Sequence, residues 1–518
     1  MQLLDLITIF IFALGIVIMG LSFSGKGRNM KSFFAAGGAV PWAMSGLSLF
    51  MGFFSAGTFV VWGSIAYSLG WIAISIQWTM AIAGFVVGFF IASRWHKTSA
   101  LTVAEYITRR LGVNTQKTYT YLFLFISLFT TGSFLYPVAK IVEVSTGMPL
   151  DLCILLLGGF CIVYVAAGGL WAVVSTDVLQ FIILTAAVLI VVPLSFGRVG
   201  GVVNFIESIP ATYFNLVNGE YTIGFIIAFG VYNAIFLGGN WAYVQRYASV
   251  NSQSSARKVG FLFGGLYVVS AVLWMLPPMI YRIVNPSLST IDAEGAYLMM
   301  CKEVLPAGLL GLMLSGMVFA TASSLNATLN ISSGVVTNDI FKRLFPQSSD
   351  KTLMRVARIS TIIFGLLAII VALLIPLMGG IVNVVISVAA LTGVPLYLPI
   401  IWTLFSKRQT EYSVITTTLV SLGANAFFKF ITPLWGFGFN RAEEMIVGVA
   451  FPVFCLIAFE LYYKLNHKIS HRYVEYQEWE KENNCIKETE RKEDKVMTEA
   501  DNKFSKRVIS LSLIHISE

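Results

Sequence analysis

A polar stretch inside an apolar region, running from Ala320 to Asp339, carries the clearest chemical potential of the chain. It reads A-T-A-S-S-L-N-A-T-L-N-I-S-S-G-V-V-T-N-D and is rich in small hydroxyl and amide side chains. Spacing of i, i+3, i+4, i+7 places Ala320, Ser323, Ser324 and Ala327 on one helical face. Such a face is unsuited to lipid. It fits close packing against other helices, or coordination of a hard cation through oxygen atoms.

The composition defines the kind of element that must position this stretch. Of the 518 residues, 57% are hydrophobic and 12% are charged, and the mean hydropathy is +0.78. Because soluble globular proteins carry about 25% charged residues, we predict an all-α integral membrane protein embedded in a lipid bilayer. The first apolar run, 3–22, lacks a basic start and a cleavage pattern. We therefore interpret it as a retained span and not as a signal peptide.

Apolar runs of about 20 residues or more predict about thirteen transmembrane helices. The expected ranges are 3–22, 43–66, 70–93, 117–145, 150–168, 174–196, 221–246, 258–283, 303–340, 357–377, 379–405, 411–431 and 444–465. Residues 1–465 are expected to form one transmembrane domain. The Glu-, Lys- and Arg-rich segment 466–518 is expected to be a charged cytoplasmic tail.

Basic residues cluster in alternate predicted loops, at 26–31, 94–117, 246–258, 342–355 and 407–408. Because Lys and Arg are enriched in cytoplasmic loops, this pattern predicts an N-terminus outside and a C-terminus in the cytoplasm of a multi-pass plasma-membrane protein. An odd number of spans agrees with that assignment. The net charge of +8 therefore reflects membrane topology and not nucleic-acid binding.

The predicted spans lack the cluster of acids, bases or metal ligands that a membrane enzyme would need. Five cysteines are scattered without disulfide or metal spacing, and four histidines lie outside the spans or near their ends. The sequence contains no G-x-S-x-G, P-loop or H-E-x-x-H motif. We therefore do not expect an enzyme, and no obligate protein partner is evident.

Glycines interrupt two spans that are five spans apart. The second span carries Gly46, Gly52, Gly57 and Gly63, and the seventh carries Gly224, Gly230, Gly238 and Gly239. Glycine-broken helices at matching positions of two halves are typical of inverted-repeat transporters, whose binding sites lie at the breaks. The repeats would cover about 43–196 and 221–431. The alternative is that these glycines only allow close helix packing.

Polar groups inside spans are costly and usually face the interior of a helix bundle. The second, third and seventh spans offer Ser55, Thr58, Gln77, Asn233 and Asn240. The ninth span offers Thr321, Ser323, Ser324, Asn326, Thr328 and Asn330. Each of them can serve as an interhelical hydrogen bond or bond back to its own helix. Their concentration in the glycine-broken spans and neighbouring helices favours a binding site.

Three charged residues near span ends leave alternatives open. Asp177 follows Gly168–Thr176 where the sixth span is expected to begin, so it is either a helix cap or an ion or proton relay. Lys140 and Glu143 are i, i+3 neighbours near the end of the fourth span. They can form an ion pair or extend outward to the interface.

At these residues the chain resembles the sodium:solute symporter family, which includes sodium–glucose, proline and sialic acid cotransporters. The similarity covers about residues 30–410. Its markers are S-F-F-A-A-G-G-A-V-P-W (32–42), G-L-S-L-F-M-G-F-F-S-A-G-T-F-V-V-W-G-S-I-A-Y-S-L-G-W (46–71), G-G-L-W-A-V-V-S-T-D-V-L-Q (168–180), V-Q-R-Y (244–247), L-P-A-G-L-L-G-L-M-L-S-G-M-V-F-A-T-A-S-S-L-N-A-T-L-N (305–330) and D-I-F (339–341).

The resemblance implies a LeuT-type fold of two inverted five-helix repeats with extra terminal helices, and sodium-driven uptake by alternating access. Sodium (Na+) would be the coupling ion. By matching positions, its ligands would be the carbonyls of Met51, Phe54 and Ala320 and the hydroxyls of Ser323 and Ser324. Carbonyl and hydroxyl oxygens suit a hard cation.

A second sodium site, present in some members of the family, is less well supported by the residues of this chain. It would use Asp177 and two positions beyond the serine pair, which are Asn326 and Ala327 here. Asn326 can offer an oxygen, whereas the side chain of Ala327 cannot. We therefore expect one sodium ion, with Asp177 and Asn326 as a second ion site or a relay.

The resemblance also implies a substrate pocket between the broken helices. The matching positions are Phe53, Ser55, Thr58, Gln77, Asn233, Phe236, Asn383 and Ser387. The sugar transporters have a carboxylate in place of Gln77, and the fourth span has no arginine to clamp a substrate carboxylate. This lining suits a small neutral polar solute such as a sugar-like compound or a polyol. An organic anion held by helix N-termini is an alternative, as are a proton-coupled transporter of the same fold and a membrane solute sensor.

Overall fold

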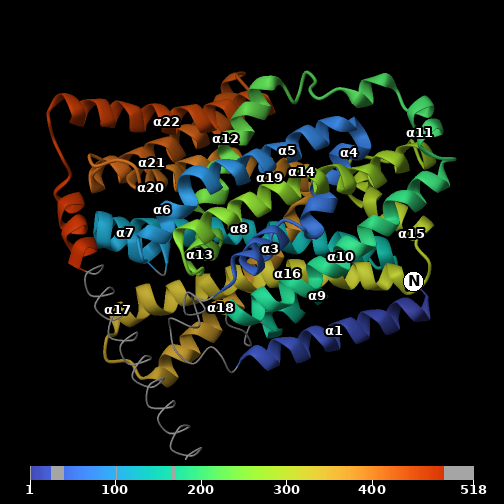
Figure 1. The fold of residues 1–518 in the computed structure, drawn as a ribbon, viewed down its shortest axis with the longest axis horizontal. Helices are drawn as coiled ribbons and strands as arrows, with labels where there is room; N and C mark the ends of the chain where they lie inside the picture. The colour runs from blue at the N-terminus through green and yellow to red at the C-terminus, as the bar shows by residue number, and fades with distance from the viewer. Residues whose placement is uncertain (1, 25–39, 101, 165–169, 483–518) are drawn as a thin grey trace, which may run out of the picture.

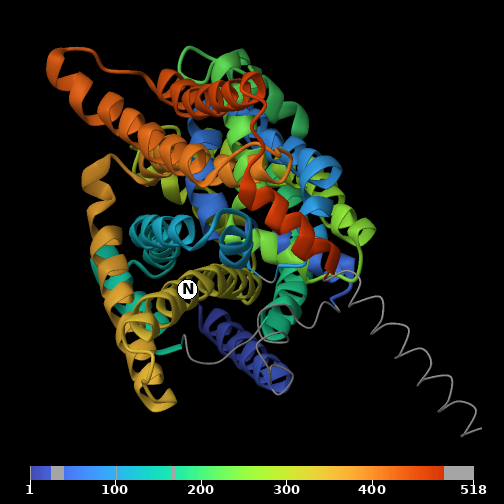
Figure 2. The ribbon, with the colours of Figure 1, turned by 90° about the vertical axis from the view of Figure 1, so that its left-hand side faces the viewer.

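Helices occupy each of the thirteen expected spans in the computed structural model, which describes residues 2–24, 40–100, 102–164 and 170–482 (Figure 1). Across these four stretches no strand forms, and the only bridge joins Val40 and Val250. The predicted all-α class is confirmed. The nonpolar helix α1 (Leu3–Ser24) lies at one edge of the helix array, and α22 (Arg441–Leu465) lies at the opposite edge (Figures 1 and 2).

The first expected repeat contains ten elements, several of which are short pieces of a longer span. They are α3 (Trp42–Met51), η2 (Thr58–Trp62), α4 (Gly63–Leu69), α5 (Trp71–Val86), η3 (Val87–Ile91), α6 (Ala92–Lys97), α7 (Val103–Leu111), α8 (Val113–Thr146), α9 (Leu150–Tyr164) and α10 (Leu170–Arg198). The short elements α11 (Val202–Ser208) and η4 (Ala211–Phe214) lead out of this half of the chain.

The remaining elements form the second expected repeat and the terminal helices. They are α12 (Ile223–Gly239), α13 (Trp241–Ala248), α14 (Gln253–Val284), η5 (Asp292–Gly295), α15 (Ala296–Val304), α16 (Leu309–Val335), η6 (Val336–Phe341), α17 (Lys342–Leu344), α18 (Asp350–Leu374), η7 (Pro376–Met378), α19 (Ile381–Val388), η8 (Ala389–Gly393), α20 (Val394–Thr403), α21 (Glu411–Ala426), η9 (Phe427–Ile431), η10 (Thr432–Trp435) and α22.

Not every expected span is one long helix. Among the described residues, eight helices are long and apolar enough to cross a membrane, or nine if the bent pair α12–α13 is one span. The expected span 43–66 instead consists of the shorter apolar helices Trp42–Met51 and Thr58–Leu69. Spans of this kind are interrupted where the backbone is needed at a site.

Both glycine-rich spans are broken, and the glycines also allow close packing. The helix α3 ends at Met51, and residues 52–55 leave the helical path before η2. The pair α12–α13 bends by 59° at Asn240. A Cβ on Gly46 would lie 2.8 Å from Leu262, and one on Gly239 would lie 2.7 Å from Tyr397. The break and the packing explanations therefore both hold, at different glycines.

Two polar contacts involve α8, one within the helix and one with its neighbours. The expected Lys140–Glu143 pair forms at 2.8 Å, with the lysine side chain almost fully buried. The Glu294 carboxylate, in η5, accepts a hydrogen bond from the Tyr136 hydroxyl at 2.8 Å and from the Ile381 amide, which begins α19, at 2.9 Å. Burial raises the pKa of Glu294 above its usual range. This carboxylate thus ties α8 to the start of α19.

The first part of the expected tail is a helix, at 471–482, that packs on the transmembrane domain. The buried Tyr476 ring lies 5.8 Å from the ring of Tyr106 in α7, and the Arg109 guanidinium lies 3.9 Å from the ring of Trp479. Aromatic and cation–π contacts therefore hold this segment against α7.

The crossing of α5 and α14 gives a stability prediction. A Cβ on Gly84 would lie 2.7 Å from the Gly264 amide nitrogen and 2.8 Å from its Cα, so the two backbones would have to separate. We expect Gly84→Ala to destabilise the protein by about 1–3 kcal/mol through overpacking. Thermal unfolding in detergent measures the change in Tm.

The matched control is Gly265→Ala, one residue beyond this crossing. Its Cβ would meet nothing within 4 Å. This variant is expected to keep the Tm of the wild type. Equal Tm values for Gly84→Ala and the wild type would contradict the packing described for α5 and α14.

Candidate functional site

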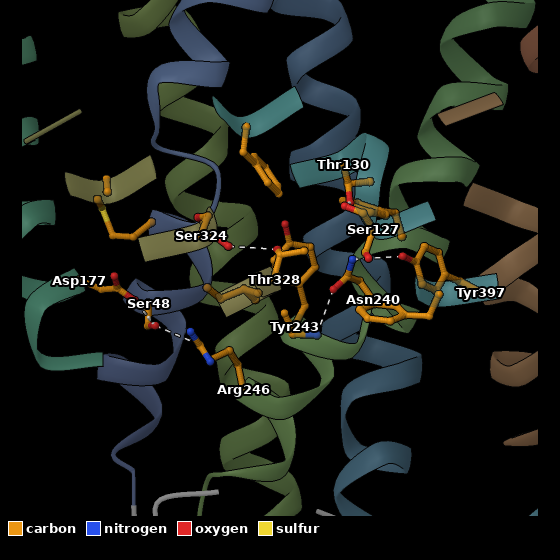
Figure 3. Close-up of a pocket in the computed structure, with 18 of the residues that line it drawn as sticks. Ser48, Ser127, Thr130, Asp177, Asn240, Tyr243, Arg246, Ser324, Thr328 and Tyr397 are labelled. Carbon is orange, nitrogen blue, oxygen red and sulfur yellow. Dashed lines mark hydrogen bonds between the residues drawn. The ribbon is translucent and has the colours of Figure 1, made fainter. Parts of the chain in front are cut away.

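A cavity lies beside both helix breaks and opens along α8 and α16 (Figure 3). Its walls come from α3, α8, α10, α12, α13, α16 and α20. The lining residues are Ser48, Leu49, Met51, Gly52, Phe123, Ile126, Ser127, Thr130, Phe134, Asp177, Phe236, Asn240, Ala242, Tyr243, Arg246, Ala320, Ser324, Thr328 and Tyr397. We name it the ion cavity.

The structure brings three of the five predicted sodium ligands to this cavity. Met51, at the end of α3, lines it together with Ala320 and Ser324 of α16. Phe54 lies in the broken segment beyond Met51, with its ring 4.7 Å from that of Trp274, and it is not among the lining residues. The backbone of Ser323 belongs to α16, and its side chain lies outside the described residues. Two distant segments therefore meet as the predicted site requires.

A buried threonine fixes the broken segment to α16. The Ala56 amide, just past the break, donates to Thr321 Oγ1 at 3.0 Å, and this hydroxyl donates to the Met317 carbonyl at 2.9 Å. A backbone amide freed by a helix break inside a membrane needs such a partner. The sequence identified Thr321 only as a polar residue. Thr321 lies three residues before Ser324 and therefore on the same side of the helix. This spacing could have indicated that Thr321 lies near the break.

Asp177 does not cap the helix, so the cap interpretation is wrong. The helix α10 begins at Leu170, which places Asp177 about two turns inside it. Asp177 Oδ2 accepts a 2.5 Å hydrogen bond from Ser48 Oγ. The Ser48 Oγ in turn accepts a hydrogen bond from Arg246 Nε at 3.0 Å (Figure 3). This chain of contacts joins α10, α3 and α13 at the ion cavity. It leaves the ion or relay role as the prediction for Asp177.

Two residues of this cluster were missed by the sequence analysis. Arg246 was counted as a loop charge that sets topology, yet it lies at the end of α13 and lines the ion cavity. Ser48 appeared only inside a family marker. The signal for Arg246 was its place in V-Q-R-Y, at the end of the broken span. The side chain of Asn326, the other predicted second-ion residue, lies outside the described residues.

The donors of the ion cavity fit a hard monovalent cation. They include the neutral hydroxyls of Ser48, Ser324 and Thr328 and the Asp177 carboxylate. In the described part of the chain, no three His, Cys, Asp or Glu side chains gather as they would for a transition metal. Oxygen ligands with at most one carboxylate suit sodium.

A second cavity continues from the first on the other side of the α3 break, and we name it the solute cavity. The two share Gly52, Ile126, Thr130, Phe134, Phe236, Tyr243 and Tyr397. Six of the eight predicted substrate residues line it: Phe53, Ser55, Thr58, Gln77, Asn233 and Phe236. The remaining lining includes Trp62, Phe229, Tyr232, Tyr267, Val385, Val388, Thr392 and Tyr397.

The polar groups of the solute cavity are uncharged. Gln77 is 3% exposed, and its Nε2 has no hydrogen-bond partner among the described residues. Asn233 donates from Nδ2 to Thr79 Oγ1 at 2.8 Å, and Thr58 donates to the Phe53 carbonyl. Because a buried amide donor without a partner is costly, Gln77 is suited to donate to a bound solute.

The structure does not bring Asn383 and Ser387 to the solute cavity. Asn383 Oδ1 instead accepts a 2.6 Å hydrogen bond from Arg441 Nη2. The cavity face of α19 and η8 carries Val385, Val388, Ala389 and Thr392, which follow i, i+3, i+4, i+7 spacing. Positions 383 and 387 fall outside this register. Val385, Val388 and Ala389 carry no polar side-chain group, which explains why the search of the sequence for polar residues missed them.

Similarity to known proteins covers most of the chain. The family model for the sodium:solute symporter family matches residues 33–420. A sodium/glucose cotransporter of Vibrio parahaemolyticus is 28% identical over 83% of this chain and 86% of its own length. Sodium/myo-inositol cotransporter 2 of Sus scrofa is 27% identical over 81% of this chain and 68% of its own length.

Solved structures show the same fold. A Na+-coupled sialic acid symporter superposes with a TM-score of 0.73 at 20% identity, over 89% of this chain and 98% of its own. Mhp1, a nucleobase-cation-symport-1 family transporter, gives 0.53 at 14% identity, over 87% and 99%. These neighbours confirm the expected LeuT-type fold.

The sequence match and the shared fold agree with the geometry of the two cavities. Broken helices, an oxygen-lined cavity and an adjoining amide-lined cavity are what a cation-coupled carrier of this architecture requires. No catalytic constellation was expected from the sequence, and the matched relatives are transporters. The chain belongs to the sodium:solute symporter family and is a sodium-coupled solute transporter, not an enzyme.

Proposed function

We propose that this protein imports a small neutral polar solute together with sodium by alternating access. The observation that carries the proposal is that Met51, Ala320 and Ser324 face one cavity, which continues past the α3 break into the cavity lined by Gln77 and Asn233. An ion at the first cavity and a solute at the second would therefore contact the same broken segment. This shared segment gives a physical route for coupling.

Sodium would be held by the carbonyls of Met51, Phe54 and Ala320 and by the hydroxyls of Ser323 and Ser324. The Ala56–Thr321 hydrogen bond keeps the broken segment next to α16. An ion can shift the equilibrium between outward-open and inward-open states only if it binds one of them more tightly. Because the ligands come from two elements, any state that separates α3 from α16 loses affinity for sodium.

Asp177 is proposed as a relay or second-ion carboxylate next to this site, with Asn326 of α16 as the other candidate residue. Its hydrogen bond with Ser48 joins it to α3, and Arg246 stands at the other side of Ser48. Movement of α3 or α13 would therefore change the partners of this carboxylate. One sodium ion per transport cycle is the proposed stoichiometry, because Ala327 offers no side-chain oxygen.

A sugar-like compound or a polyol is the proposed solute. The solute cavity combines uncharged polar groups with aromatic rings, among them Phe53, Phe236 and Tyr232. The relatives are named for glucose and myo-inositol. A neutral, hydroxyl-rich molecule can accept from Gln77 and pack its apolar face on the rings. An organic anion is the second candidate, supported by the cationic side chain of Arg246, which lines the adjoining ion cavity.

The proposed location is the plasma membrane, with the N-terminus outside and the tail in the cytoplasm. Residues 1–465 would be the transporting domain, with repeats at about 43–196 and 221–431, and residues 466–518 would be the tail. Counterflow with sugars, polyols, amino acids and organic acids in proteoliposomes identifies the solute. Failure of every neutral compound with success of an anion would contradict the proposed solute class.

Ser324 offers a direct test of the ion site. We expect Ser324→Ala to raise the sodium concentration for half-maximal uptake by about tenfold, because one oxygen ligand is lost at a cost of about 1.4 kcal/mol. Sodium titration of solute uptake measures it. Ser315→Ala is the control, because the Ser315 hydroxyl bonds back to Gly311 within the same helix. An unchanged sodium dependence in Ser324→Ala would exclude the site.

Gln77 tests the solute cavity separately from the ion. We expect Gln77→Leu to raise the half-saturating solute concentration by about three- to tenfold at saturating sodium, as the loss of one hydrogen bond predicts. Gln116→Leu is the control, since Gln116 bonds to Thr120 and lines neither cavity. Unaltered solute saturation in Gln77→Leu would remove this residue from the binding site.

A further inference from the structure

The first helix of the chain, outside both expected repeats, places a buried carboxylate at the start of α16. Asp5 of α1 is 2% exposed. Its Oδ1 accepts hydrogen bonds from the Gly308 amide at 2.7 Å and the Gly311 amide at 3.1 Å. Its Oδ2 accepts from the Gln2 amide at 2.8 Å. One side chain of α1 therefore satisfies amides at the N-terminus of the helix that carries Ala320 and Ser324.

The chemistry of a helix N-terminus favours this contact. The first amides of a helix have no carbonyl partner within it, and the helix dipole makes that end positive. Inside a membrane, unsatisfied amides are especially costly. The element Pro306–Gly308 before α16 brings no side-chain cap, since Gly308 stands at the cap position. No side chain at the N-cap position of α16 accepts from its first amides, and the carboxylate of Asp5, on another helix, takes this role.

The backbones of α1 and α16 approach so closely that the contact tolerates little displacement. A Cβ on Gly311 would lie 2.3 Å from the Asp5 carbonyl oxygen and 2.4 Å from Thr8 Oγ1. Thr8 Oγ1 in turn donates to the Gly308 carbonyl at 3.1 Å. The Asp5 carboxylate thus binds the Gly308 amide, and the Thr8 hydroxyl binds the Gly308 carbonyl. This arrangement fixes α16 along its axis as well as sideways.

A second contact extends the attachment toward the ion cavity. The ring of Phe12 lies 5.9 Å from that of Phe319, the residue before Ala320. Gly311 and Ala320 are nine residues apart, which is about 13.5 Å along a helix. The helix α1 also packs against α10, which carries Asp177. It therefore braces two of the helices that bring polar side chains to the ion cavity, α10 and α16.

We infer that Asp5 is a positioning residue for the sodium site: it holds α16 at the height where Ala320 and Ser324 face the end of α3. The inference rests on the proposed sodium site and assigns a role to a helix outside the repeats. Loss of the carboxylate frees the first turn of α16 and lets the helix shift. Sodium then meets ligands that are misplaced but still present, so it binds more weakly at an unchanged number of sites.

Binding of radioactive sodium to the purified full-length protein in detergent tests this role. Asp5→Asn keeps the size of the side chain and removes its charge. We expect the half-saturating sodium concentration to rise about three- to tenfold, within the range of coupling energies that a remote residue can supply. The number of ions bound per chain at saturation stays the same. A residue needed only for folding would instead lower that number and leave the half-saturating concentration unchanged, which would overturn the inference.

Two further variants keep the test decisive. Thr8→Val removes the hydrogen bond to the Gly308 carbonyl, together with the bonds of the same hydroxyl to the Leu4 and Asp5 carbonyls of its own helix, and keeps the Asp5 carboxylate. It should therefore fold and show a smaller rise, and it carries the test if Asp5→Asn does not fold. Asp151→Asn removes an exposed acid in the first turn of α9 and should change nothing. Unchanged half-saturation in both Asp5→Asn and Thr8→Val would contradict the inference.

Hydrogen–deuterium exchange separates this inference from the proposed function. The amide of Gly311 should exchange faster in Asp5→Asn than in the wild type, whatever ion the protein uses. If the wild type binds no sodium, the proposed function fails. If sodium binds and Gly311 exchange is unchanged in Asp5→Asn, only the positioning role fails.

Discussion

The structure depends on what happens to backbone amides and carbonyls where a helix breaks inside the membrane. The Ala56 amide has left the helical pattern and finds Thr321 Oγ1 at 3.0 Å. In a bilayer no water can replace that partner, so the broken segment must stay beside α16. Met51, the last residue before the break, lines the same cavity as Ser324. A structural requirement of the membrane thus creates the oxygen-rich corner that a cation can use.

The same requirement explains how the ion and solute cavities are related. Phe53 and Ser55 of the broken segment line the solute cavity, whereas Met51 lines the ion cavity. A displacement of this short segment therefore acts on both. The Ser48–Asp177 and Ser48–Arg246 hydrogen bonds tie α3 to α10 and α13 one turn before the break. Coupling between two ligands needs such an element with two arrangements that both ligands bias.

Much of this could be predicted from the sequence, because membrane helices leave strong signals. Long apolar runs gave the spans, and the glycines of the second and seventh spans indicated the breaks at Gly52 and Asn240. The i, i+3, i+4, i+7 spacing of Ala320, Ser323, Ser324 and Ala327 predicted one face of α16, and Ala320 and Ser324 of this set line the ion cavity. Other features depend on contacts between distant segments. Asp177 was expected near the start of a helix that in fact begins at Leu170, and the register of α19 placed Asn383 beside Arg441. The contact of Asp5 with Gly308 joins residues 303 positions apart, and no local pattern announces it.

Accumulation of the solute chosen by counterflow, in proteoliposomes with an inward sodium gradient and equal pH on both sides, tests the central claim most directly. The account predicts uptake above equilibrium that stops when sodium is replaced by choline. Uptake that continues in choline and follows an imposed pH gradient would show that protons drive transport, with Asp177 as the titrating group, and would contradict sodium coupling.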